Sequence, residues 1–282
     1  MTIHTLDTGL FKLDGGAMFG VVPKSIWNKL NPADDNNMCT WSMRCLLVEE
    51  GNTLMLIDTG IGNKQDTKFF SHYYLHGEGS LKRAIQQAGY SINDITDVFL
   101  THLHFDHCGG AIEYSDESHR TTRPAFPNAR FWSNEAHWLW ATKPNAREKA
   151  SFLPLNILPI EESGALNFVS ETHQPAINGL EIITVSGHTE QQMLPLISYK
   201  DKQLLFCGDL FPSAAHLPLP YVMSYDVRPL LTMQEREQVL SRAADNPDFV
   251  LVFEHDHQNE CATVKKTEKG FAVDSLFPLE AL

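Results

Sequence analysis

The stretch His102-Leu103-His104-Phe105-Asp106-His107 decides the fold, and it follows directly on the apolar run 97–100. It offers four potential metal ligands within six residues. A regular helix would scatter these side chains, whereas a tight loop after a strand can turn two of them toward one ion and two toward another. Imidazoles and carboxylates without thiolate suit zinc, and also iron, manganese or cobalt. The competing interpretation is an ordinary polar surface turn.

Four other apolar runs of the chain also end in polar, chemically capable residues. Residues 53–57 lead into Asp58-Thr59-Gly60, 180–185 into Ser186-Gly187-His188, 204–206 into Cys207-Gly208-Asp209, and 249–253 into Glu254-His255-Asp256. Loops at the carboxyl ends of strands are where α/β sheets usually hold ligands. If these strands point their carboxyl ends to one edge, we expect the polar residues to converge there.

The candidate ligands divide into two sets that share one carboxylate. One set is His102, His104 and His188, the other is Asp106, His107 and His255, and Asp209 would bridge two ions with its two oxygens. The sequence therefore predicts that the protein binds two divalent metal ions, with zinc as the first choice of metal. This convergence of distant residues argues against the surface-turn interpretation.

The order of the apolar runs and the helical patterns predicts one layered α/β (α+β) domain over residues 1–282. Helices are expected over 81–88 behind Ser80, over 134–142, and over 233–244 behind Thr232 with a capping box to Glu235. Trp138 and Trp140 are two residues apart and cannot share a helix face, so one of them should look toward a loop, a pocket or a partner.

Composition excludes several classes of function. The net charge of −13 disfavours general nucleic-acid binding, and no run approaches the roughly 20 apolar residues of a membrane span. Five cysteines without C-x-x-C spacing, and no basic-then-apolar leader, predict a reduced, cytoplasmic protein. Exposed aromatic residues are compatible with a homodimer.

The H-x-H-x-D-H loop, Gly187-His188-Thr189, Gly208-Asp209 and His255-Asp256 together are similar to the dinuclear metal signature of the metallo-β-lactamase-fold hydrolases. The similarity covers most of the chain in the right order, including the early Asp58-Thr59-Gly60. More narrowly, residues 15–24 and 208–212 resemble the YtnP-like quorum-quenching lactonases. This resemblance implies an αβ/βα four-layer sandwich with the metals at one edge. It also implies hydrolysis of N-acyl-homoserine lactones, so that the expected partner is a small-molecule ester or lactone.

The resemblance suggests a mechanism and leaves rival reactions open. A hydroxide shared by the two ions would attack the lactone carbonyl, and Asp106 would deliver a proton to the leaving ring oxygen. The better-studied lactonases place a tyrosine three residues after the bridging aspartate, where this chain has Pro212. Because related members with the same ligands act on other electrophiles, an arylesterase or phosphotriester hydrolase is the first alternative. A mono-iron sulfur dioxygenase is the second.

A last group of residues is expected around the metals, each with a structural alternative. Asp58 would orient a ligand histidine or simply cap a turn. His216 would replace the missing tyrosine as a donor or be an ordinary loop histidine. Apolar residues near the amino terminus would line an acyl-chain pocket or pack in the core. The candidate substrate contacts are Met18, Phe19, Trp27, Phe105 and His216.

Overall fold

The computed structural model describes residues 1–282 and has a mixed α/β architecture. The chain divides into two compact units. The first contains Met1–Gly9, Met43–His72 and Gly77–Asn178, and the second contains Leu10–Ser42, Tyr73–His76 and Gly179–Leu282. None of the helices combines the length and the apolar character that crossing a bilayer requires.

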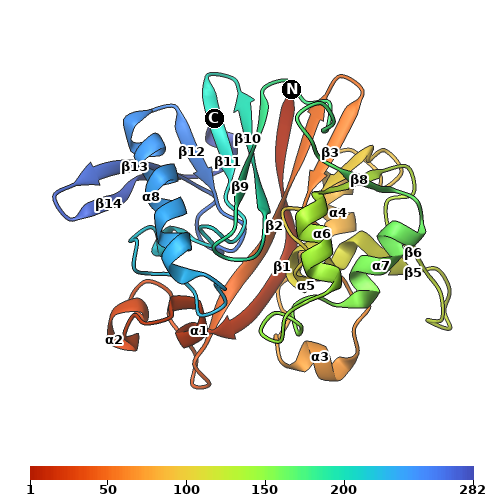
Figure 1. Ribbon diagram of the computed structural model, residues 1–282, viewed down its shortest axis with the longest axis horizontal. Coiled ribbons are helices and arrows are strands. Elements are labelled where there is room, and N and C mark those ends of the chain that lie inside the picture. Colours follow the sequence, from red (N-terminus) through yellow and green to blue (C-terminus); the bar gives the residue numbers. More distant parts are fainter. The chain divides into compact units, whose positions relative to one another are not determined.

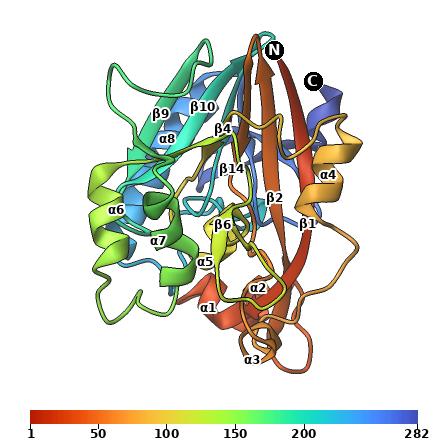
Figure 2. The same ribbon diagram turned by 90° about the vertical axis from the view of Figure 1, so that its right-hand side faces the viewer.

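The first unit is built on a six-stranded sheet in the order β1-β2-β3-β4-β7-β8. Its strands are β1 (Thr2–Asp14), β2 (Met38–Glu50), β3 (Thr53–Ile57), β4 (Asp97–Phe99), β7 (Arg130–Ser133) and β8 (Leu166–Phe168). The long strands β1 and β2 run side by side, and each belongs in part to the second unit (Figure 2). Strands β3, β4, β7 and β8 are parallel, so their carboxyl ends share one edge.

Short helices complete the first unit. They are α3 (Thr67–Ser71), α4 (Leu81–Gln87), α5 (Phe105–Cys108), the 3-10 helix η1 (Gly109–Ala111), α6 (Glu135–Thr142) and α7 (Pro154–Glu162), and β5 (Ile112–Tyr114) and β6 (Thr122–Pro124) form a small hairpin. Ile85 of α4 and Trp138 of α6 are buried in the same core as Leu56 and Val98. The helices expected near 81 and 134 are therefore confirmed.

The second unit is built on a six-stranded sheet in the order β14-β13-β12-β11-β10-β9. Its strands are β9 (Leu180–Val185), β10 (Gln192–Tyr199), β11 (Lys202–Phe206), β12 (Phe249–Val252), β13 (Cys261–Thr267) and β14 (Gly270–Phe277). Strands β11 and β12 are parallel, and β10 is antiparallel to both β9 and β11. Strands β9, β11 and β12 therefore end at the same edge, as the sequence predicts.

Helix α8 (Pro229–Asp245) lies across this sheet, in blue in Figure 1, and buries Val239 and Leu240 in the core of the unit. The helix expected over 233–244 thus begins earlier, at Pro229. Proline suits the first helical position because its missing N–H would be unpaired there anyway. The capping box is also wrong, because Glu235 instead accepts hydrogen bonds from the backbone N–H groups of Ser186 and Gly187.

The amino-terminal part of the second unit contains α1 (Gly15–Phe19) and α2 (Lys24–Trp27), two short helices that we did not predict from the sequence. The helix signal that was missed is Asp14, whose carboxylate accepts a hydrogen bond from Ala17 N at 2.8 Å. Two further 3-10 helices, η2 (Ala214–His216) and η3 (Leu279–Ala281), complete the unit.

Candidate metal centre

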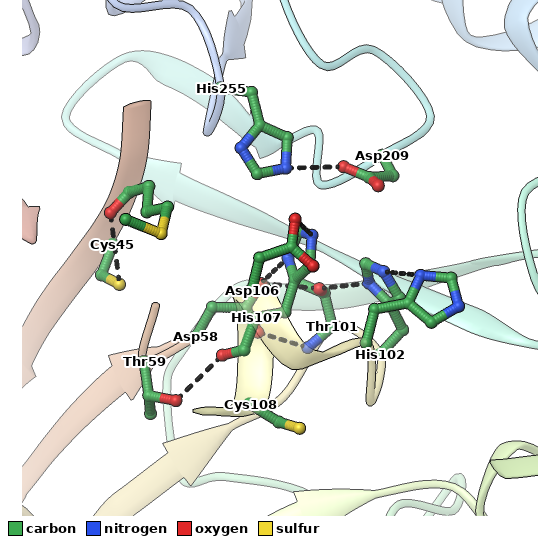
Figure 3. Close-up of polar contacts among 12 residues, drawn as sticks. Cys45, Asp58, Thr59, Thr101, His102, Asp106, His107, Cys108, Asp209 and His255 are labelled. Carbon is green, nitrogen blue, oxygen red and sulfur yellow. Dashed lines mark hydrogen bonds and ion pairs between the residues drawn. The ribbon is translucent and has the colours of Figure 1, made fainter. Parts of the chain in front are cut away.

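The H-x-H-x-D-H loop is held by the aspartate that ends the neighbouring strand. Because β3 and β4 are parallel neighbours, Asp58 lies beside Thr101. Asp58 Oδ1 accepts a hydrogen bond from Thr101 N at 2.8 Å, and Oδ2 accepts one from Thr101 Oγ1 at 2.6 Å. The same Oδ2 lies 3.1 Å from Nδ1 of His107 (Figure 3). One buried carboxylate therefore fixes the start of the loop and the orientation of its last histidine.

The first unit presents its four candidate ligands as two pairs. His102 Nε2 lies 3.1 Å from His104 Nδ1, and His107 Nε2 lies 3.8 Å from Asp106 Oδ2. Two nitrogens that bind one tetrahedral zinc ion at about 2.0–2.1 Å are separated by about 3.3 Å, so the first pair has the spacing of shared ligands. All four side chains are buried. This donor set, imidazole and carboxylate, fits a divalent transition metal.

The backbone of the D-T-G-I-G segment also packs against the ligand loop. Thr59 donates from its backbone N to the carbonyl oxygen of His107 at 2.7 Å (Figure 3 shows the hydroxyl of Thr59 bonded to the same carbonyl). A Cβ atom on Gly62, whose φ is +67°, would lie 2.4 Å from the carbonyl oxygen of Gly109. Lys64 Nζ donates to that same oxygen, and burial lowers the pKa of Lys64 to about 8. The close approach explains why glycines follow Asp58 and His107.

In the second unit, Asp209 faces two histidines with different oxygens. Its Oδ2 lies 3.1 Å from His188 Nε2, and its Oδ1 lies 3.0 Å from His255 Nε2, the contact drawn in Figure 3. A carboxylate that shares each oxygen with a different imidazole has the arrangement of a ligand bridging two ions. The shared edge of β9, β11 and β12 brings these three residues together.

The outer nitrogens of these two histidines are engaged as well. His188 Nδ1 lies 2.9 Å from Asp226 Oδ1, and His255 Nδ1 donates to the carbonyl oxygen of Ser42 at 2.7 Å. Such contacts direct the Nε2 lone pair of each ring toward an ion. Burial alone would lower the pKa of His188, but the charges of Asp209 and Asp226 outweigh it and raise the pKa to about 10.

The segment after Asp209 is held by a fully buried arginine of α8. Arg236 Nε donates to the carbonyl oxygen of Leu210 at 2.7 Å, and Nη1 donates to those of Tyr221 at 2.8 Å and His216 at 3.2 Å. Its guanidinium carbon lies 5.4 Å from the centre of the Phe211 ring, and burial lowers its pKa to about 10. Arg236 therefore ties the loop that follows Asp209 to the long helix α8.

His216 and the amino-terminal apolar residues form one aromatic stack inside the second unit. The Phe19 ring lies between His216, at 4.6 Å, and Trp27, at 5.4 Å, and both contacts are nearly parallel. His216 Nε2 lies 3.0 Å from the carbonyl oxygen of Met18, and Nδ1 lies 2.7 Å from Ser213 Oγ. Burial lowers the pKa of His216 to about 3, so the ring is neutral. Both of its nitrogens bond within the protein, which is the geometry of a packing residue.

The last candidate substrate contact, Phe105, is also largely buried. Its ring lies edge-on to Phe69 with centres 5.3 Å apart.

Several residues that contact the candidate ligands or the chain next to them have no motif in the sequence. Those in the second unit are Ser42, Asp226 and Arg236, and those in the first are His137 and Glu148. Only Arg236 left a signal, since it falls one turn before Val239 and Leu240 on the apolar face of α8. A charge at such a position indicates a buried, bonded side chain.

Comparison with known proteins agrees with this geometry. The model of the metallo-beta-lactamase superfamily matches residues 44–255. The probable metallo-hydrolase Rv2300c of Mycobacterium tuberculosis is 29% identical over 238 residues, which are 75% of this chain and 73% of that protein. A crystal structure of a probable metal-dependent hydrolase from Staphylococcus aureus superposes with a TM-score of 0.84 at 26% identity, covering 100% of this chain and 98% of the other.

Lactonases are among the structures of similar fold. AidC, a dizinc quorum-quenching lactonase solved with the product N-hexanoyl-L-homoserine, superposes with a TM-score of 0.76 at 23% identity, covering 98% of this chain and 95% of AidC. The chain therefore belongs to the metallo-β-lactamase superfamily and has its fold. The family and these relatives indicate a metal-dependent hydrolase.

Proposed function

We propose that the protein is a dinuclear metal-dependent lactonase that opens N-acyl-homoserine lactones. The observation that carries the proposal is Asp209, whose two oxygens lie 3.1 and 3.0 Å from the Nε2 atoms of His188 and His255. Because each oxygen faces a different histidine, this carboxylate could be shared by two ions. The coarser conclusion, a metal-dependent hydrolase, rests on the family.

We further propose that residues 1–282 form a single catalytic domain that holds two ions. The first ion takes His102, His104 and His188, the second takes Asp106, His107 and His255, and Asp209 is shared. Two divalent ions held in this way, with zinc as the first choice of metal, would lower the pKa of a bound water. They would also place positive charge beside an ester carbonyl.

The protein residues have defined tasks in this reaction. The five neutral imidazoles and two carboxylates hold the ions, and the buried partners of the histidines keep the Nε2 or Nδ1 lone pairs directed inward. Asp106, in the first turn of α5, would deliver a proton to the ring oxygen that leaves as the lactone opens. Asp58 acts through His107, which it orients.

The choice of a lactone as substrate is supported by relatives. AidC and an N-acyl homoserine lactone hydrolase with N-hexanoyl-L-homoserine at its catalytic metal centre share the fold, with TM-scores of 0.76 and 0.68. We further propose a cytoplasmic location, because all five cysteines are buried and none of them forms a disulfide. The homodimer stays a prediction, which the molecular mass in solution tests.

One sequence feature favours a second candidate function. Pro212 stands where the better-studied lactonases have a tyrosine, and His216 bonds within the protein. An arylesterase or phosphotriester hydrolase on the same metals is therefore the alternative. A mono-iron sulfur dioxygenase is less well supported, since the Asp106–His107 pair and His255 provide ligands for a second ion.

The deciding experiment pairs elemental analysis with a substrate panel. Protein purified without a His tag or added metal is expected to hold two divalent ions per chain and to show its highest kcat/KM on N-acyl-homoserine lactones. Higher kcat/KM on an aryl ester or a phosphotriester would replace the lactonase with the alternative. One iron per chain with oxygen uptake on a persulfide would favour the dioxygenase.

A further inference from the structure

A buried carboxylate outside the predicted ligand set lies against one of the ligands. Glu148 stands in the connection between α6 and α7, and its side chain is 3% exposed. Its Oε1 lies 3.5 Å from Nε2 of His104. Burying a carboxylate is costly unless hydrogen bonds and charge partners compensate for the loss of water. The buried position of Glu148 beside His104 therefore indicates that its carboxylate acts on this histidine.

The other oxygen of Glu148 is fixed by two donors. Trp140 Nε1 donates to Oε2 at 2.7 Å, and Asn145 Nδ2 donates to the same atom at 2.5 Å. Asn145 also accepts a hydrogen bond from the backbone N of Glu148 at 3.1 Å. Trp140 is thus the tryptophan of α6 that looks toward a loop, while Trp138 packs in the core. These contacts leave Oε1 turned toward His104.

The same part of the chain contacts the ligand loop at three consecutive residues. Helix α6, green in Figure 2, supplies His137, whose Nε2 accepts a hydrogen bond from Leu103 N at 2.9 Å. The Phe152 ring lies 4.7 Å from the His104 ring, and Phe105 N donates to the carbonyl oxygen of Ser151 at 3.0 Å. Residues 137–152 therefore support the loop on the side of the His102–His104 pair.

The two nitrogens of His104 have different surroundings. Nδ1 faces His102 Nε2 at 3.1 Å, in the spacing of two ligands of one ion, and Nε2 faces Glu148. A proton on Nε2 that points to a carboxylate leaves the Nδ1 lone pair for the metal and makes the ring a stronger ligand. Glu148 thus selects the tautomer that a metal at Nδ1 requires.

We propose that Glu148, fixed by Trp140 and Asn145, is a positioning residue that sets the affinity of the ion bound by His102 and His104. It acts through its contact with His104, so we expect the ion bound by His102 and His104 to respond to its loss more than the other ion does. The inference rests on the metal centre of the proposed function and not on the choice of a lactone as substrate.

The test is the variant Glu148→Gln, which keeps the shape of the side chain. Metal-free protein is titrated with Zn²⁺ against a competing chelator, and with Co²⁺ while the absorption spectrum is followed. Loss of such an outer partner typically weakens metal affinity by about 10–100-fold. We expect that loss for one ion and an unchanged affinity for the other. The matched control is Glu135→Gln, an exposed glutamate at the start of α6.

A thermal readout separates positioning from a general structural role. The amide oxygen of Glu148→Gln can still accept hydrogen bonds from Trp140 and Asn145, so the metal-free variant should unfold near the temperature of the metal-free wild type. The rise in Tm on adding Zn²⁺ should be smaller, because weaker binding stabilises less. Trp140→Phe removes one of the two donors to Oε2 and should show a smaller loss in the same direction.

Three outcomes decide the question. Wild-type affinities for both ions in Glu148→Gln would overturn the proposal. Equal weakening of both ions with a lower metal-free Tm would overturn it in favour of a structural role. If the wild type binds two ions with the expected response but opens no lactone, this inference stands and the proposed substrate falls.

Discussion

At the scale of single residues, Asp209 is fixed by contacts to both of its carboxylate oxygens and to the chain that follows it. Each of its oxygens has its own histidine, and Arg236 holds the chain immediately behind it. Asp209→Ala removes the shared ligand, so we expect both ions to bind more weakly and activity to fall by more than the 10–100-fold typical of an outer partner. Elemental analysis and kcat measure the two effects. Full metal loading with unchanged turnover would contradict the bridging assignment.

The pKa of His188 makes metal binding depend on pH. Asp209 and Asp226 raise that pKa to about 10 in the metal-free protein, so the ring carries a proton at neutral pH that a metal must displace. Binding should therefore release a proton, and the apparent affinity should rise by about tenfold per pH unit between pH 6.5 and 9. Calorimetric titration in buffers of different ionisation enthalpy measures the released proton.

The same pKa has a consequence for stability. Because the folded pKa of His188 is raised above its unfolded value, its stabilising contribution to the metal-free protein is fully present below pH 6.5 and is lost as the pH rises through about 10. An affinity for Zn²⁺ that does not change between pH 6.5 and 9 would show that His188 is neutral before the metal binds.

At the scale of elements, helix α8 supports the loop that carries Asp209. Arg236→Met leaves three buried carbonyl oxygens without their donor, which should lower the free energy of unfolding by about 3 kcal/mol and weaken metal binding. Arg242→Met, on the same helix, removes a surface ion pair with Glu181 and should cost at most about 1 kcal/mol. Denaturant unfolding compares the two, and equal losses would refute a special role for Arg236.

At the scale of the whole molecule, the chain passes between the two units several times, and β1 and β2 belong to both. Bound ions add to the stability of such a fold only if the folded state binds them better than the unfolded chain does. Zn²⁺ at a thousand times its Kd stabilises by about 4 kcal/mol per ion, which corresponds to a rise in Tm of about 10 °C for a chain of this size.

Removal of metal tests this expectation. Dialysis against a chelator should lower Tm by that amount, and added Zn²⁺ should restore both Tm and activity. A Tm that is the same with and without chelator would contradict tight metal binding by the folded protein.

Much of the fold could be predicted because short β-branched and apolar runs leave few alternatives. The runs 53–57, 180–185 and 249–253 form strands within one residue of the expected bounds. The start of α8 was missed, because Pro229 begins a helix while Thr232 resembles a cap only in sequence. The helices at Gly15 and Lys24 were also missed, since segments of four or five residues are stabilised mainly by packing and not by propensity.

The sequence by itself determined the family and the types of candidate ligand. Histidines and an aspartate in this spacing can be recognised as metal-binding groups without knowing where the loop lies in the fold. Only the tertiary structure decided which atom of each candidate ligand is available to bind a metal. His104 presents Nδ1 because Glu148 lies at Nε2, and Asp209 has a histidine at each oxygen because β9, β11 and β12 end at one edge. Such contacts join residues far apart in the chain. They follow no periodic pattern that could be recognised in the sequence.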